Sequence, residues 1–300
     1  PGVVNAGMVT SAVWADFNGD QKVDLVLSGE WMPIRFFEQK ENAFVERTED
    51  FGFSNTTGWW FSLAAEDMDG DGDLDFVAGN LGLNYKYQGT VEEPFHVYAD
   101  DFDENGSMDI VLGYYNDGKA YPVRGLQCSS EQIPSIKEKF KTYHAFGEAT
   151  LEKVYGSHKL SGALHYEAKT FASSYIENLG NDSFKITPLH NLAQVSSVNS
   201  ILLHDVNQDG AKDIIIAGNM HESEVETPRN DTGVGLWLAG SGSGEFTPVP
   251  TVESGFYAPN VVNDMKLIRK GEELLILLGN NNAKLQTFLL SQTNNQISQK

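Results

Sequence analysis

The sequence predicts an all-β fold of about five four-stranded repeats, arranged as a β-propeller or as part of one. A nine-residue acidic segment recurs four times, and each copy lies between two short apolar runs. A second recurring pattern places a strand, a Gly/Asn-rich turn and a phenylalanine between the acidic segments. Two strands around each acidic segment and two in each hairpin give about four antiparallel strands per repeat, which is the size of a propeller blade.

The acidic segments follow the pattern D-x-[DN]-x-[DN]-x-x-x-D. They are the first loop at 16–24, the second at 67–75, the third at 101–109 and the fourth at 205–213. The apolar runs LVLSG, FVAGN, IVLGY and IIIAGN follow them directly. Short apolar runs bounded by turn residues are typical of strands, so each acidic segment is predicted to be a loop that joins two strands.

The hairpin pattern occurs at 36–44, 175–184 and 236–246. Its Gly and Asn residues suit turns that need a positive φ. Residues Asn263–Asn280 are interpreted as a fifth, metal-free repeat, because LLILLGN matches the other strands but the segment around Asp264 lacks the acidic pattern. No repeat of this size can bury its apolar faces alone, so neighbouring repeats are predicted to stack.

The spacing of the loops predicts one domain over residues 1–300 with an insertion. Successive loops begin 51, 34 and 104 residues apart, so the short interval suggests a trimmed blade and the long one an insertion at about 125–168. Within the insertion, Ile133, Ile136, Phe140 and Tyr143 have helical spacing. A second short helix is predicted from Thr150 to Tyr155, ended by Gly156.

The residue types in the loops predict calcium binding. Ca²⁺ takes about 6–8 oxygen ligands, and a loop can supply side-chain oxygens at positions 1, 3, 5 and 9 and a backbone carbonyl at position 7. One ion per loop gives about four Ca²⁺ ions. Positions 1, 3, 5, 7 and 9 are Asp16, Asn18, Asp20, Lys22 and Asp24; Asp67, Asp69, Asp71, Asp73 and Asp75; Asp101, Asp103, Asn105, Ser107 and Asp109; and Asp205, Asn207, Asp209, Ala211 and Asp213.

An EF-hand and an Asx-rich turn are two alternatives to a calcium loop of this kind. An EF-hand needs a Glu at position 12 and flanking helices, but position 12 holds Leu27, Ala78, Leu112 and Ile216 within β-rich runs. Asx-rich turns without an ion are the other alternative. Four copies in phase, each before a strand, favour bound ions over such turns, since closely spaced carboxylates repel one another without a cation.

Composition restricts the function classes. The chain has 21 Lys+Arg against 42 Asp+Glu, a net charge of −21, which disfavours nucleic-acid binding. Cys128 is the single cysteine, so no internal disulfide forms. No apolar run reaches the length of a transmembrane span. The abrupt start suggests that a leader was removed and that the chain is part of a longer one, which predicts an extracellular, cell-surface or periplasmic location.

The loops and their following strands resemble the FG-GAP/VCBS repeats of integrin alpha subunits and of many bacterial surface proteins. The stretches GMVTSAVWADFNGDQKVDLVLSGEWMPI, GWWFSLAAEDMDGDGDLDFVAGNLGLN and QCSSEQIPSIKEKFKTYHAFGEATLEKVYG are similar to Bacteroidetes VCBS-repeat proteins related to the ASPIC/UnbV group. The resemblance implies a propeller, structural Ca²⁺ and export, and it implies little about ligand or activity. Gln21 and the segment around Asp264 depart from the pattern.

Two function classes remain open from the sequence. The first is a binding or adhesion module for a protein or glycan. The second is a propeller-fold carbohydrate-active enzyme, a lyase or hydrolase. The sequence shows no G-x-S-x-G motif, and none of its seven histidines forms a close zinc-type pair along the chain. His221 lies in HESEVE with Glu222, Glu224 and Glu226, which is interpreted as a solvated acidic loop. The binding class is therefore favoured, and no catalytic residue is predicted.

Overall fold

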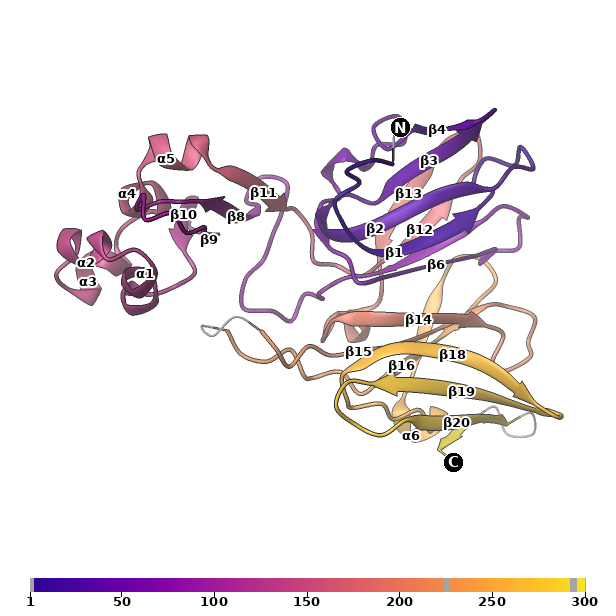
Figure 1. Ribbon diagram of the computed structural model, residues 1–300. Coiled ribbons are helices and arrows are strands. Elements are labelled where there is room, and N and C mark those ends of the chain that lie inside the picture. The colour runs from indigo at the N-terminus through magenta and orange to yellow at the C-terminus, as the bar shows by residue number, and fades with distance from the viewer. Residues whose placement is uncertain (1–2, 224–226, 292–295, 300) are drawn as a thin grey trace. The chain divides into compact units, whose positions relative to one another are not determined.

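The structure is a computed structural model that describes residues 3–223, 227–291 and 296–299, and its strands form five antiparallel sheets (Figure 1). The chain divides into two compact units. Unit 1 holds the described residues up to Tyr85, then Phe171–Ser223, and those from Arg229 onward. Unit 2 holds Lys86–Thr170 and a short second segment that ends at Pro228. The prediction of an all-β, propeller-like fold is confirmed.

Unit 1 contains four sheets that we call blades 1 to 4. In each, the strands pair in the order in which they occur along the chain. Blade 1 consists of β1 (Met8–Ala15), β2 (Asp24–Met32), β3 (Arg35–Lys40) and β4 (Ala43–Glu46), and β5 (Gly58–Trp59) also pairs with β2. Blade 2 consists of β6 (Ser62–Glu66), β7 (Asp75–Gly79), β12 (Ser174–Asn178) and β13 (Phe184–Pro188), and blade 3 consists of β14 (Val198–His204), β15 (Asp213–Gly218), β16 (Leu236–Gly240) and β17 (Phe246–Val249). Blade 4 consists of β18 (Val262–Lys270), β19 (Glu273–Asn280), β20 (Gln286–Ser291) and β21 (Gln296–Gln299). A short helix, α6 (Thr251–Ser254), follows β17.

Serine side chains link the first strands of successive blades. The Leu63 amide donates to Ser11 Oγ at 3.2 Å and so joins blades 1 and 2. Ser62 Oγ donates to the Val198 carbonyl at 2.8 Å, and the Met265 amide donates to Ser200 Oγ at 2.8 Å. The four first strands therefore lie side by side in chain order, as the inner strands of neighbouring propeller blades do.

The hydrophobic core lies between blades. Phe76 of β7 packs with Phe36 of blade 1, whereas its neighbour Val77 packs with Ile214 of blade 3. Successive side chains of a strand point to opposite faces of the sheet, so one strand contributes to two cores. Ile215 continues the pattern by packing with residues of blade 4. The predicted stacking of repeats is confirmed, because both faces of a middle blade are buried by its neighbours.

Blade 4 matches the predicted fifth repeat in its strands and in the loss of the acidic loop. β18 and β19 are joined by a tight turn in which Gly271 has a φ of 64°. Asp264 does not lie in a loop; it belongs to β18, where its Oδ2 is 3.3 Å from the Lys266 ammonium. The connection is therefore too short to hold the nine-residue pattern of the other repeats.

Unit 2 is a four-stranded sheet with helices, inserted between β7 and β12 of blade 2. Its strands are β8 (Phe95–Asp100), β9 (Asp109–Asn116), β10 (Lys119–Pro122) and β11 (Leu164–Ala168), paired in the order β10-β9-β8-β11. The helices are α1 (Leu126–Gln132), α2 (Ser135–Lys139), α3 (Tyr143–Gly147), α4 (Leu151–Tyr155) and α5 (Ser157–Gly162). None of the helices in the described part of the chain is long and apolar enough to cross a membrane.

The inserted segment is longer than the sequence suggested. It includes the third acidic loop, which joins β8 to β9 in the sheet of unit 2. The 34-residue interval before this loop therefore reflects the start of the insertion and not a trimmed blade. The helix at 151–155 is confirmed, with Thr150 as its N-cap and Gly156 at a φ of 89°. Of the residues with helical spacing, Ile133 and Ile136 are buried, whereas Tyr143 is 69% exposed.

Candidate metal-binding loops and a histidine cluster

In all four acidic loops, the position 1 aspartate accepts hydrogen bonds from backbone amides later in the loop. In the fourth loop, the Asp209 and Gly210 amides donate to the two oxygens of Asp205, at 3.1 and 3.0 Å. The first and third loops repeat this pair of bonds at Asp16 and Asp101. In the second loop, the Gly70 amide donates to Asp67 Oδ1 at 2.8 Å. The position 1 carboxylate therefore organises the turn in every loop.

Two loops bring three carboxylates together. The carboxylate oxygens of Asp67, Asp69 and Asp71 lie within 4.8 Å of one another, and so do those of Asp101, Asp103 and Asp109. Since Ca–O distances are about 2.3–2.6 Å, two oxygens on the same ion lie at most about 5 Å apart. Both clusters therefore fit a single calcium ion. In the first and fourth loops, position 3 is the neutral amide of Asn18 or Asn207.

The position 9 aspartates join each loop to the blade. Asp24, Asp75 and Asp213 have no exposed surface, and Asp109 is 3% exposed. In the three blades of unit 1 that have an acidic loop, Oδ1 of this residue accepts from a backbone amide near the end of the third strand: Gln39 at 2.7 Å, Asn178 at 2.8 Å and Gly240 at 2.9 Å. Oδ2 accepts from the position 2 amide in three loops: Met68 at 3.1 Å, Phe102 at 2.9 Å and Val206 at 2.8 Å.

These bonds give position 9 a structural role that sequence reasoning missed. Burial raises the pKa of Asp24, Asp75 and Asp213 above the ordinary value. The Tyr175 hydroxyl also donates to Asp75 Oδ2 at 2.8 Å. Asp75 lies outside the cluster of Asp67, Asp69 and Asp71. Its predicted role as a calcium ligand stays a prediction, whereas its hydrogen bonds to β12 are part of the fold.

Asp73, at position 7 of the second loop, is an electrostatically strained carboxyl. Burial, together with the charges of Asp71 and Asp75, raises its pKa to about 7. Its Oδ1 is buried and has no hydrogen-bond partner among the described residues. A cation in this loop would relieve the electrostatic repulsion on Asp73. In all four loops, the position 7 amide donates to the position 5 side chain; these donors are Lys22, Asp73, Ser107 and Ala211.

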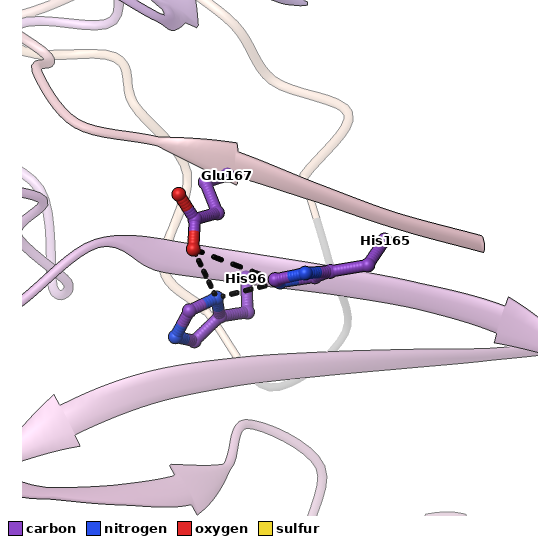
Figure 2. A group of neighbouring side chains, drawn as sticks. All are labelled: His96, His165 and Glu167. Atoms are coloured by element: carbon purple, nitrogen blue, oxygen red, sulfur yellow. Dashed lines mark hydrogen bonds and ion pairs between the residues drawn. The ribbon is translucent and has the colours of Figure 1, made fainter. Parts of the chain in front are cut away.

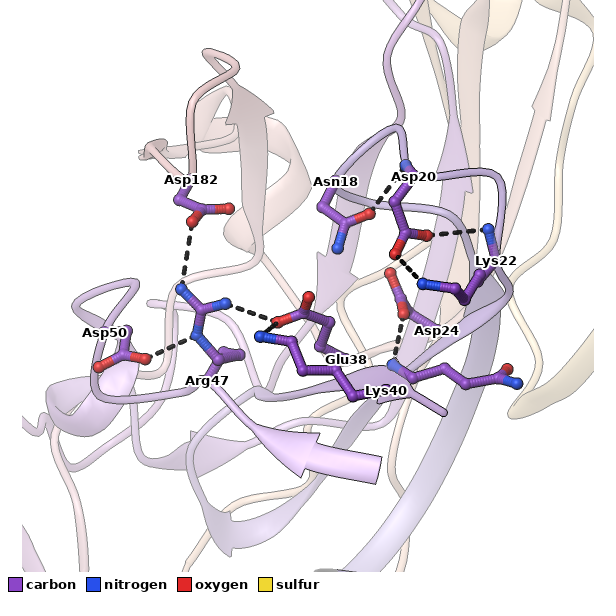
Figure 3. A network of polar contacts seen from close by, with 10 residues as sticks. Asn18, Asp20, Lys22, Asp24, Glu38, Lys40, Arg47, Asp50 and Asp182 are labelled. Carbon is purple, nitrogen blue, oxygen red and sulfur yellow. Dashed lines mark hydrogen bonds and ion pairs between the residues drawn. The ribbon is translucent and has the colours of Figure 1, made fainter. Parts of the chain in front are cut away.

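The first loop carries its own cation. Lys22 Nζ lies 2.8 Å from Asp20 Oδ2, and this hydrogen bond lowers the pKa of Asp20 (Figure 3). Gln21 takes a φ of 65°, where the third and fourth loops have glycine. An ammonium on one of the ligand carboxylates competes with a metal ion, so this loop fits calcium least well.

Arg47 ties blade 1 to blade 2 close to the first loop. Its guanidinium lies 2.6 Å from Glu38, 2.6 Å from Asp50 and 3.1 Å from Asp182 of the β12–β13 hairpin (Figure 3). These hydrogen bonds raise the pKa of Arg47 further above its ordinary value. The network shows that not every carboxylate near the loops is available to a metal ion.

Unit 2 contains a cluster that corrects the sequence analysis. His96 and His165 were not expected to pair, yet His96 Nδ1 lies 3.0 Å from His165 Nε2 (Figure 2). Glu167 Oε1 lies 3.8 Å from the first nitrogen and 4.0 Å from the second. Burial lowers the pKa of His165, and it lowers that of His96 to about 4. The sequence did contain a sign of this cluster. In the segments HVY at 96–98 and HYE at 165–167, the first and third residues lie on the same face of a strand, because successive side chains point to opposite faces.

Each unit has a cavity beside titratable groups. In unit 2, a cavity of about 380 Å³ is lined by His96, His165 and Glu167 together with residues of α4 and α5. In unit 1, a cavity of about 390 Å³ is lined by Thr10, Asn199, Asn263, His221 and Glu222, among others. Its walls include the first strands of blades 1, 3 and 4. Of the predicted acidic loop around His221, Glu224 and Glu226 lie outside the described residues.

Comparison with known families agrees with this repeat architecture. Residues 16–78 match the family model of the FG-GAP-like repeat. The matched segment begins at the first residue of the first acidic loop and ends in β7, just after the second loop. No curated protein matches the chain. The narrower similarity to the ASPIC/UnbV group stays a prediction. Residues 16–78 therefore carry an FG-GAP-like repeat, and the other loops and blades repeat its strand–loop–strand pattern.

Proposed function

We propose that the chain is a calcium-stabilised, exported propeller module that binds a protein or a glycan at the bacterial cell surface. The observation that carries the proposal is the pair of carboxylate clusters in the second and third acidic loops, in each of which the three ligand oxygens lie within 4.8 Å of one another. FG-GAP repeats occur in propeller modules that often serve in binding, and the match over residues 16–78 supports that class. The proposal includes about four Ca²⁺ ions, one for each loop.

Calcium would act on the loops and through them on the blades. In the second loop, Asp67, Asp69 and Asp71 would hold the ion, with the Asp73 carbonyl and Asp75 as the further predicted ligands. The bound ion supplies positive charge that cancels the repulsion between these carboxylates. Because Asp75 is also bonded to Asn178 of β12, an ordered loop keeps β6, β7 and β12 in register. Extracellular modules bind Ca²⁺ with weak affinities that suit an exported protein.

The cavity of unit 1 is the surface that we propose for ligand binding. Asn199 and Asn263 contribute amides from first strands of two blades, and Phe61 contributes an aromatic ring. Amides pair with sugar hydroxyls or peptide groups, and aromatic rings stack on apolar sugar faces. A cavity that combines amides with apolar surface, at the first strands of several blades, therefore suits a glycan or a peptide segment.

A carbohydrate-active enzyme is the second candidate. His221 and Glu222 line the same cavity and are the titratable groups among its described lining residues. Glycoside hydrolysis ordinarily needs two carboxylic acids that flank the bond. With one carboxylate among the described lining residues, we favour binding. Loss of polysaccharide cleavage in Glu222→Gln, with binding retained, would instead support the enzyme.

Calorimetric titration with Ca²⁺ tests the calcium part of the proposal. Asp69→Ala removes one carboxylate of the second-loop cluster, leaves no side-chain oxygen at position 3 and keeps the hydrogen bonds of Asp75 in place. We expect this variant to lose one of about four binding equivalents. Glu92→Ala is the matched control, because it removes the same charge from an exposed segment before β8. Unchanged stoichiometry in Asp69→Ala, or an equal loss in both variants, would contradict the proposal.

Ligand binding needs its own measurement. The full chain is applied to arrays of glycans and proteins, once with saturating Ca²⁺ and once with chelator. We expect retention on a restricted set of ligands only when Ca²⁺ is present. Equal retention under both conditions would show that ligand binding does not depend on Ca²⁺ in the loops. No retention on any ligand would count against the binding class.

A further inference from the structure

We propose that unit 2 holds a zinc-type site for a divalent transition-metal ion, formed by His96 Nδ1, His165 Nε2 and Glu167 Oε1. This site is distinct in place and in chemistry from the acidic loops. Imidazole nitrogens suit Zn²⁺ and its neighbours in the first transition row, whereas Ca²⁺ takes oxygen ligands. Two histidines and one carboxylate are a ligand set that zinc sites use.

The arrangement of the three atoms is the main argument. Their separations are 3.0, 3.8 and 4.0 Å, and a point equidistant from all three lies about 2.1 Å from each. Zn–N and Zn–O distances in proteins are about 2.0–2.2 Å, so one ion fits between the three ligand atoms with little movement. Figure 2 shows the three groups converging on this point.

A hydrogen bond between the two rings is the simpler interpretation, but it accounts for only part of the geometry. A ring proton can join His96 and His165 across 3.0 Å. Glu167 Oε1 is 3.8 and 4.0 Å from the two ring nitrogens, which is too long for a hydrogen bond to either. A carboxylate oxygen that faces both nitrogens at this range is explained by a shared cation.

The sheet and its neighbours hold the ligands in place. His165 lies opposite Tyr98 in the β8–β11 pairing, and Glu167 lies opposite His96. These four residues therefore share one face of a regular antiparallel pair. The Tyr98 ring stacks on His165 with an interplanar angle of 2° and a centroid distance of 4.2 Å. Lys169 Nζ lies 3.7 Å from Glu167 Oε2 and leaves Oε1 directed at the rings.

The ion would have a position open to a further ligand. The cavity of about 380 Å³ that these residues line also includes Tyr115, Glu152 and Ser161 in its walls. Three protein ligands beside a cavity are typical of zinc sites that accept water or a small anionic ligand as a fourth group. The proposed metal ion could therefore bind and polarise a small oxygen ligand, in addition to any effect that the ion has on the stability of unit 2.

Cobalt and zinc titrations of the untagged full chain test the site. The buffer contains saturating Ca²⁺, so that the acidic loops are not available to the second metal. We expect one Co²⁺ per chain, with visible absorption of low-coordinate cobalt bound to nitrogen and oxygen, and we expect Zn²⁺ to displace it. Wild type without this absorption, or without zinc binding that survives Ca²⁺, would overturn the proposal.

The variants separate this site from unspecific binding to histidine. His165→Ala and Glu167→Gln should each weaken zinc binding by more than about 100-fold, since they remove a direct ligand. His144→Ala is the matched control: His144 Nε2 lies 3.4 Å from Glu148 Oε1, but both side chains are highly exposed. If circular dichroism shows that His165→Ala is unfolded, the zinc affinity of the near-isosteric variant Glu167→Gln tests the assignment by itself. Equal zinc affinity in wild type and Glu167→Gln would contradict the assignment.

Discussion

At the scale of single residues, the acidic side chains of the loops have two tasks: hydrogen bonding to the backbone and gathering oxygens for an ion. The position 9 aspartate is buried and accepts from backbone amides, whereas positions 1, 3 and 5 are more exposed; in the third loop, Asp109 also lies in the cluster with Asp101 and Asp103. The first task belongs to the fold with or without an ion. The second fits metal binding. Variants at positions 5 and 9 of the same loop should therefore have different effects on stability with and without Ca²⁺, although both remove one negative charge.

The fourth loop offers this comparison. Asp213→Ala should lower the free energy of unfolding by about 1–3 kcal/mol even in chelator, because the buried Val206 amide and the half-buried Gly240 amide lose their acceptor. Asp209→Ala should leave the ion-free stability nearly unchanged and remove most of the stabilisation that Ca²⁺ gives. Urea unfolding with and without Ca²⁺ measures both effects. If both variants lose the same amount in chelator, the division of tasks is wrong.

Asp73 predicts a pH dependence of the ion-free protein. Its pKa in the folded state is about 7, against an ordinary value of 3.8. A raised carboxyl pKa means that the unfolded chain gives up this proton more readily than the folded chain does. The Asp73 carboxyl therefore lowers the free energy of unfolding as pH rises from about 4, and this destabilisation becomes constant above about pH 7. Asp73→Asn should therefore be more stable than wild type in chelator at pH 8 and nearly equal at pH 4. A difference that does not grow with pH would contradict the assignment.

The sequence was sufficient to predict the loops, because all members of each lie within nine residues. It was not sufficient for the bonds of position 9, since the insertion of unit 2 places Asn178 103 residues from Asp75 along the chain, and the two become neighbours only through the pairing of β7 with β12. The histidine cluster was missed for the same reason. His96 and His165 are 69 residues apart and meet through the pairing of β8 with β11.

At the scale of elements, alternation and turn chemistry were sufficient to predict the hairpins. β12–β13 turns through Gly180, Asn181 and Asp182, all at positive φ, as the Gly/Asn-rich turn indicated. The lengths of the helices were predicted less accurately than the hairpins. The apolar spacing at 133–143 suggested one longer helix, but the structure has short helices that pack around the unit 2 core, with Ile133 between α1 and α2. Packing against the sheet therefore overrode local periodicity.

The glycine at the end of β7 gives a prediction for strand packing. A Cβ on Gly79 would lie 2.2 Å from the Val198 carbonyl oxygen of the neighbouring blade. Gly79→Ala should therefore destabilise unit 1 by about 1–3 kcal/mol, because a backbone atom cannot move aside cheaply. Gly147→Ala is the control, since a Cβ there meets open space. Thermal unfolding of both variants tests this, and equal stability would show that the two blades are not packed this closely.

At the scale of the whole molecule, the repeats depend on one another and have no covalent cross-link. Each middle blade buries its two faces against different neighbours, and Cys128 is the single cysteine. The boundary of unit 2 escaped sequence reasoning because its third loop follows the same motif as the others. A repeat motif identifies a local strand–loop–strand unit, but it does not say whether that unit joins the array or forms a separate sheet.

Chelation should lower the thermal stability of the whole chain. A ligand that binds only the folded state adds about 2.7 kcal/mol per site at a free concentration 100-fold above the dissociation constant. With about four sites on a chain of net charge −21, the melting temperature should rise steeply with Ca²⁺. Scans in Mg²⁺ of equal ionic strength control for general screening. Identical melting curves in Ca²⁺ and in chelator would exclude a structural role for the ion.

Anomalous diffraction from a crystal grown with Ca²⁺ tests the central claim most directly. The second loop is the decisive place, because it gathers Asp67, Asp69 and Asp71. The account predicts an anomalous peak there, about 2.3–2.6 Å from an oxygen of each of these residues and from the Asp73 carbonyl. A well-ordered second loop without a peak, in a crystal saturated with Ca²⁺, would contradict the account.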